Sequence, residues 1–83
     1  MHNRMEVKFL AQAKNEAFAR VAIAAFAVQL NPTLPEMADI KTAVSEAVTN
    51  VVVHAYPDCI GQVELHFRQE ADVLTIEIGR AHV

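Results

Sequence analysis

The sequence predicts an α+β fold in two layers, with helices on one face of a small mixed or antiparallel β-sheet. Two observations lead to this prediction. Apolar residues alternate with polar ones near both ends of the chain, as in half-buried strands, and recur every three or four residues in the middle, as in helices. The order is therefore β-α-α-β-β. With 83 residues there is room for one small domain, which we place at residues 1–83.

The first strand is expected over about residues 5–11, where the pattern has a period of two. Its apolar residues occupy every second position and charged residues stand between them: Met5, Val7, Phe9 and Ala11 alternate with Glu6 and Lys8. One side of this strand should therefore face the core while the other faces water.

The first helix is expected from Asn15 to Leu30, and it is apolar on more than one side. One face carries Phe18, Val21, Ala22, Ala25 and Val28, and a second carries Ile23, Phe26, Ala27 and Leu30. Only one face can cover the sheet. We therefore expect Ile23, Phe26 or their neighbours to be covered by a partner or by a segment outside these 83 residues.

Asn31-Pro32 ends that helix, because proline disfavours the helical conformation in the residue before it. The next four residues, from Thr33 to Glu36, predict a capping box that starts a second helix. Apolar residues then recur at spacings of three and four toward Tyr56-Pro57, where the helix should end: Met37, Ile40, Val44, Ala47, Val48, Val51 and Ala55.

The last part of the chain predicts a β-hairpin with a polar turn at residues 69–72. Its two apolar rows alternate with polar residues: Val63, Leu65 and Phe67 before the turn, and Leu74, Ile76 and Ile78 after it.

Composition excludes several functions. The net charge is -3 without a cluster of Lys or Arg, so neither a nucleic-acid surface nor an electrostatic membrane anchor is expected. The longest apolar run, Val21 to Val28, is far below the roughly 20 residues that cross a bilayer. No signal peptide precedes it, so a cytoplasmic protein is expected. The single cysteine, Cys59, is expected to be an inert loop thiol, and two glycines are too few for a P-loop.

The second helix also carries a polar ridge. Glu46, Asn50 and His54 are four residues apart, so they should stand one above another. A carboxylate there can accept a proton from an attacking hydroxyl, and an amide oxygen is a suitable ligand for Mg²⁺ on nucleotide phosphates. The alternative is that this ridge is only the solvated side of an amphipathic helix.

The wider motif favours the chemical interpretation. Residues 45–56, SEAVTNVVVHAY, resemble the N-box of the GHKL superfamily of ATPases and kinases, and within it the anti-sigma-F factor family of sporulating bacteria. The resemblance extends over residues 5–77 and includes NEAFARV at 15–21, QLNPT at 29–33 and DIKT at 39–42.

This resemblance implies the N-terminal portion of a Bergerat-fold kinase domain that uses ATP and Mg²⁺. It assigns Glu46 as catalytic base and Asn50 as the ligand of Mg²⁺, with Thr49 and His54 near the nucleotide. It further implies a homodimer that binds a sporulation sigma factor and phosphorylates a serine of an anti-anti-sigma protein. Arg20 corresponds to a partner-facing arginine.

The chain departs from that family after the last strand. The family continues with an Asp-x-Gly-x-Gly box, whose Asp reads adenine, and a glycine-rich lid. Here the residues are EIGRAHV at 77–83, and Ile78 occupies the place of that Asp. A frameshift or a premature stop would produce such an ending. The resemblance therefore leaves a second function open, a catalytically inactive fragment that only dimerises or binds a partner.

Two of these residues also have simpler interpretations. Arg20 can be a side chain whose apolar stem covers its neighbours while the charge reaches water. His54 can owe its place to the helix C-terminus, where a positive charge is favourable.

Overall fold

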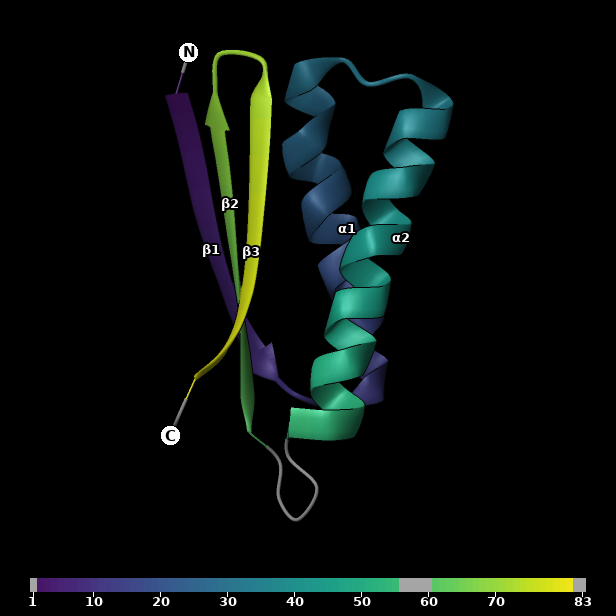
Figure 1. The fold of residues 1–83 in the computed structure, drawn as a ribbon, viewed down its shortest axis with the longest axis vertical. Coiled ribbons are helices and arrows are strands. Elements are labelled where there is room, and N and C mark those ends of the chain that lie inside the picture. The colour runs from purple at the N-terminus through teal and green to yellow at the C-terminus, as the bar shows by residue number, and fades with distance from the viewer. Residues whose placement is uncertain (1, 56–60, 82–83) are drawn as a thin grey trace.

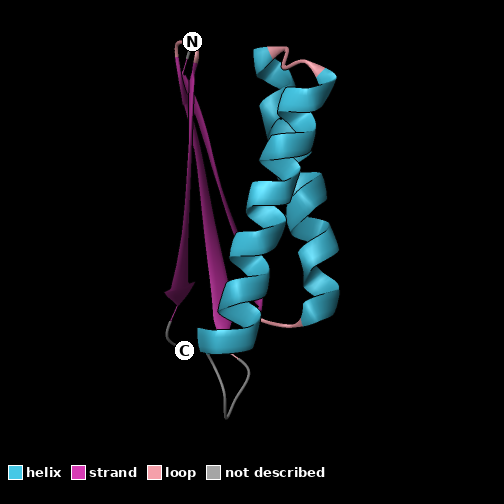
Figure 2. Ribbon diagram, turned by 45° about the vertical axis from the view of Figure 1, so that its right-hand side comes forward, coloured by secondary structure: helices cyan, strands magenta, loops and turns pink. Residues whose placement is uncertain are grey.

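The computed structural model describes residues 2–55 and 61–81. One antiparallel sheet of three strands, in the order β1-β2-β3, lies beside two helices that cover one of its faces (Figure 1). The view in Figure 2 separates the sheet from the helix layer. The elements are β1 (His2–Leu10), α1 (Glu16–Ala27), α2 (Leu34–Asn50), β2 (Gln62–Glu70) and β3 (Val73–Ala81). The predicted two-layer α+β fold and its element order are confirmed.

The strands pair so that their apolar rows lie on the helix side of the sheet. Phe67 of β2 stands between Met5 of β1 and Ile76 of β3, and Leu65 stands between Val7 and Ile78. β1 begins at His2, earlier than the expected residue 5, because its polar first residues pair with the end of β2. Their pairing depends on backbone hydrogen bonds, which a side-chain pattern does not report.

The core lies between the sheet and both helices. Phe26 of α1 packs on Phe67 with ring centroids 5.6 Å apart and ring planes at 44°. The buried side chains include Ile23 and Phe26 of α1, Val44 and Val48 of α2, and Val63, Leu65 and Phe67 of β2.

The expectation that Ile23 and Phe26 need an external cover was wrong. These two side chains face the sheet, and Ala19 and Ala27 on the same side of α1 are fully buried as well. Alanine has no bulk beyond Cβ, so the helix approaches the strands closely and the two larger side chains fill the core. The face left exposed is the other one, with Phe18 and Val21 each 69% exposed.

Both helices end in altered turns. α1 continues as a 3₁₀ turn over Val28–Leu30, after which Asn31 adopts a left-handed conformation with φ of 51°. The expected capping box at Thr33 and Glu36 is present and starts α2. α2 passes into a π-helical turn over Val51–Ala55. The expected helix end at Tyr56-Pro57 and the expected loop thiol Cys59 lie outside the described residues.

The hairpin between β2 and β3 turns within two residues, Ala71 and Asp72, because Gln69 and Glu70 still belong to the β2 strand. Ala71 has a φ of 53°, a conformation that glycine adopts more readily. Within the described ranges, none of the helices has the length and apolar character that a membrane span requires.

Candidate functional site

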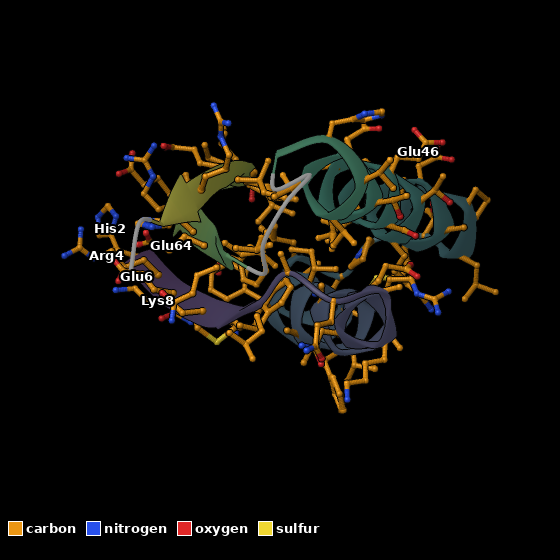
Figure 3. The ribbon with its side chains drawn as sticks, turned by 90° about the horizontal axis from the view of Figure 1, so that it is seen from below. His2, Arg4, Glu6, Lys8, Glu46 and Glu64 are labelled. Atoms are coloured by element: carbon orange, nitrogen blue, oxygen red, sulfur yellow. The ribbon has the colours of Figure 1, made fainter. Side chains whose placement is uncertain are left out.

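The proposed catalytic residues lie on the water-facing side of α2. Glu46, Thr49 and Asn50 are all exposed, whereas Val44 and Val48 of the same helix point into the core. Figure 3 shows Glu46 directed away from the sheet. Glu46 and Asn50 are separated by one helical turn, so their side chains are neighbours on one face.

Neither of these two polar groups is engaged elsewhere in the described part of the chain. The nearby acid Glu16 differs, because its Oε1 accepts a hydrogen bond from the Ser45 hydroxyl and lies 3.1 Å from Arg20 Nε. The Glu46 carboxylate makes no hydrogen bond or ion pair with any described residue, and the same is true of the Asn50 amide. Both remain available for a ligand.

These residues fit a magnesium ion that arrives with a nucleotide. Mg²⁺ usually takes only one or two protein oxygens and completes its shell with water and phosphate, so the amide oxygen of Asn50 suffices as a protein ligand. Over residues 2–55 and 61–81, there is no group of three or more His, Cys, Asp or Glu side chains that would hold a metal by itself.

His54 lies beyond the regular part of α2. The turn from Val51 to Ala55 is π-helical, so His54 follows Asn50 through a wider turn than the one that separates Asn50 from Glu46. Its place near the nucleotide stays a prediction. The His54 side chain is exposed.

Ile78 provides no polar group where the resemblance expects an adenine-reading Asp. It lies in β3 opposite Leu65 and is partly buried against the core. It lines a groove of about 160 Å³ between α2 and the sheet, and the other walls of this groove are also hydrocarbon: Ala43, Val44, Ala47, Leu65 and Ile76. A purine in this groove would find apolar contact without a hydrogen-bond partner from the side chain of residue 78.

Arg20 stands at the rim of a second groove, on the outer side of the helix layer. This groove has a volume of about 600 Å³ and is lined mainly by small and apolar side chains of α1, with Met37 and Lys41 across from them on α2. The Arg20 guanidinium is exposed and held by Glu16. Its charge is therefore fixed beside an apolar surface, which suits a partner-binding role.

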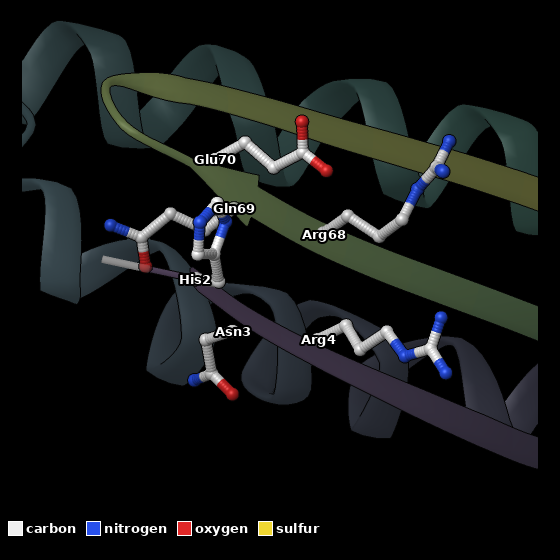
Figure 4. A pocket seen from close by; sticks show the side chains of 6 residues that line it. All are labelled: His2, Asn3, Arg4, Arg68, Gln69 and Glu70. Carbon is white, nitrogen blue, oxygen red and sulfur yellow. The ribbon is translucent and has the colours of Figure 1, made fainter.

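A third hollow, of about 420 Å³, was not anticipated from the sequence (Figure 4). It lies where β1 begins and β2 ends, and its residues are His2, Asn3, Arg4, Arg68, Gln69 and Glu70. Arg4 and Arg68 stand directly opposite each other, and Arg68 pairs with Glu77. Only the strand register brings these residues together. The sequence therefore gave no indication of this hollow.

Comparisons with known proteins agree with the motif. Residues 9–79 match the family described as histidine kinase-like ATPase domain. The anti-sigma F factor of Caldanaerobacter subterraneus subsp. tengcongensis is 53% identical over 77 residues, which are 93% of this chain and 54% of the relative. That of Clostridium acetobutylicum is 51% identical over 78 residues, 94% of this chain and 54% of the relative. The chain spans about half the length of these curated relatives.

Proposed function

The chain belongs to the histidine kinase-like ATPase domain family, and we propose that it supplies the catalytic helix of an ATP-dependent protein-serine kinase that is also an anti-sigma factor. In this proposal the protein acts in the cytoplasm as a homodimer. It binds a sporulation sigma factor and phosphorylates a serine of an anti-anti-sigma protein. The relatives named anti-sigma F factor, about half identical over most of the chain, support this assignment.

The observation that carries the proposal is the pair Glu46 and Asn50, exposed and uncommitted one turn apart on α2. Glu46 would accept the proton of the attacking serine hydroxyl while the serine oxygen bonds to the γ-phosphorus and ADP leaves with the electrons of the broken P–O bond. Asn50 holds Mg²⁺ through its amide oxygen and so fixes the position of the phosphates. Thr49 and His54 border the nucleotide. MgATP supplies the phosphoryl group when bound.

A second candidate function is a partner-binding module without catalysis. The apolar groove around Ile78 favours it, because it lacks the polar partner that adenine recognition needs. The exposed apolar side chains of α1 favour it as well, since Phe18 and Val21 are each 69% exposed and Val28 is 57% exposed. Such a module would keep the proposed partner surface at Arg20 and the homodimer, and lose only phosphoryl transfer.

Binding of a purified sporulation sigma factor tests the part that both functions share. We expect the chain to bind it, and we expect Arg20→Glu to weaken binding at least about tenfold, because a charge reversal at an interface opposes the partner's complementary charge. Lys14→Glu is the matched control, since Lys14 is exposed in the 3₁₀ turn before α1 and does not line the groove. Equal loss in both variants would indicate a nonspecific charge effect, and no binding by the parent chain would refute the anti-sigma assignment.

A further inference from the structure

Glu16 joins the two helices at the turn of α2 that leads into the proposed catalytic pair. It lies in the first turn of α1, and its Oε1 atom accepts a hydrogen bond from the hydroxyl of Ser45 on α2. The same oxygen lies 3.1 Å from Arg20 Nε, one helical turn further along α1. A single carboxylate therefore holds one side chain of each helix, and the residue that it holds on α2 directly precedes Glu46.

The position of Glu16 in its helix explains its charge but not these contacts. A negative charge is favourable at the start of any helix, because the free N–H groups there carry partial positive charge. A fully exposed acid would serve that purpose equally well. The Glu16 side chain is only 25% exposed, against 47% for Arg20, so the carboxylate is more deeply placed than the guanidinium that it contacts. Partial burial reduces the competition from water and makes this contact more persistent than an exposed ion pair.

The contact lies beside the groove on the outer side of the helix layer. Arg20 and Lys41 both line this groove. Ser45 follows Lys41 by one turn of α2, so it stands on the same face of that helix as the groove wall. The ion pair with Glu16 is made by Nε, on the side edge of the guanidinium, and a guanidinium has a second edge that carries both Nη groups. That second edge can bind a partner while Glu16 keeps its place.

We infer that Glu16 and Ser45 are positioning residues of the partner surface. Ser45 anchors the Glu16 carboxylate to α2, and Glu16 in turn holds the Arg20 side chain in one orientation at the rim of the groove. This inference rests on the proposed role of Arg20 in binding a partner. The ordering of one long side chain on binding lowers affinity about two- to tenfold, and this loss is avoided when the side chain is already held.

Ser45→Ala tests the anchor without changing any charge. Binding of the purified sporulation sigma factor should weaken about two- to tenfold, because Glu16 loses its contact with α2 and Arg20 becomes free to move. Ser45→Thr keeps the hydroxyl and should bind nearly as tightly as the parent. Thr42→Ala is the matched control, since it removes an exposed hydroxyl from the same helix and should leave binding unchanged.

A double-mutant cycle separates positioning from a general loss of stability. If Ser45 and Glu16 act through Arg20, Ser45→Ala should have no further effect on binding in a chain that already carries Arg20→Ala. A purely structural tie between the helices would instead weaken binding by the same factor in both backgrounds, and that result would overturn the proposal. So would parental affinity in Ser45→Ala.

Nuclear magnetic resonance of the arginine side chains tests the contact without any partner. In the parent, hydrogen exchange of the Arg20 Nε–H group should be several-fold slower than that of Arg4, which has no ion pair with a described residue. Glu16→Gln and Ser45→Ala should both speed up exchange at Arg20, and Thr42→Ala should not. Equal rates at Arg20 and Arg4 in the parent would overturn the positioning role. Failure of the parent to bind the sigma factor would refute the proposed function instead, and the exchange rates still decide whether Glu16 holds Arg20.

Discussion

Thr33 and Glu36 close the start of α2 by bonding to each other's backbone. The Glu36 amide donates to Thr33 Oγ1 over 3.2 Å, and the Thr33 amide donates to Glu36 Oε1 over 2.9 Å. Two N–H groups that the helix itself cannot satisfy thus find acceptors. This contact caps the helix that carries Glu46 and Asn50, so its loss should lower the free energy of unfolding.

Replacing the capping threonine tests this role. Thr33→Ala should lower the free energy of unfolding by about 1 kcal/mol, since the freed amide at the helix start regains no partner. Urea denaturation followed by circular dichroism measures the change. Thr42→Ala, at an exposed position within α2, is the matched control and should have little effect or slightly stabilise the helix. An equal loss in both variants would refute the capping contribution.

The cap also predicts a pH dependence. The hydrogen bonds from the Thr33 backbone amide and from its side chain lower the pKa of Glu36 below the usual value of 4.5. A depressed carboxyl pKa means that the ionised form stabilises the folded state. That contribution is present above the pKa of the unfolded chain and is lost as the pH falls through the folded pKa. Glu36→Gln should therefore reduce the fall in the free energy of unfolding as the pH is lowered. The same pH dependence in the parent and in Glu36→Gln would contradict the prediction.

Phe67 should be the most sensitive position of the core. It is fully buried at the centre of β2 and contacts the ring of Phe26. Phe67→Ala should cost about 3 to 5 kcal/mol, a large part of the stability of so small a domain, and is expected to leave the chain largely unfolded. Phe18→Ala, at a site 69% exposed, is the control and should change stability by no more than about 0.5 kcal/mol. Thermal melts of both variants distinguish these outcomes.

Local patterns explain why much of this fold could be predicted from the sequence. The period-two rows at Val63 and Ile76 and the cap at Thr33 depend on neighbouring residues alone, and the structure confirms them. Which face of α1 meets the sheet could not be predicted, because both faces are apolar and only packing against Phe67 decides between them.

The geometry of the candidate site was predictable to a similar extent. The spacing of Glu46 and Asn50 placed them together, since both lie within regular α-helix. The π-helical turn that contains His54 could not be predicted in the same way, because a four-residue repeat does not encode it. The pairing of Arg4 with Arg68 depends on strand register, which links residues distant in the sequence.

The chain should bind MgATP weakly. The hydrocarbon of Ile78 cannot accept a hydrogen bond from the adenine amino group, and an unpaired polar group on a buried ligand costs about 1 to 3 kcal/mol. Isothermal titration calorimetry with MgATP should therefore give a dissociation constant well above the low-micromolar range. A low-micromolar value would show that residue 78 does not occupy the position that the resemblance assigns to it.

The chain spans about half the length of its curated relatives, so the catalytic assignment is tested in a chimera in which the C-terminal half of a relative follows β3. Glu46→Gln keeps the size of the side chain and removes its ability to accept a proton. Nucleotide binding should persist while transfer to the serine falls by roughly 10² to 10⁴. Asn50→Ala removes an oxygen ligand instead, so magnesium-dependent binding and transfer should decline together.

The effects expected for Glu46→Gln and Asn50→Ala differ from those expected if these residues only formed the solvated face of the helix. If Glu46 and Asn50 had no role beyond solubility, either substitution would change stability by no more than about 0.5 kcal/mol and leave transfer intact. MgATP affinity and phosphorylation of the anti-anti-sigma protein should be measured on the same preparations, with melting temperatures to exclude unfolding. Transfer near the parental rate in Glu46→Gln would eliminate Glu46 as the base. Unaltered magnesium dependence in Asn50→Ala would eliminate Asn50 as the metal ligand.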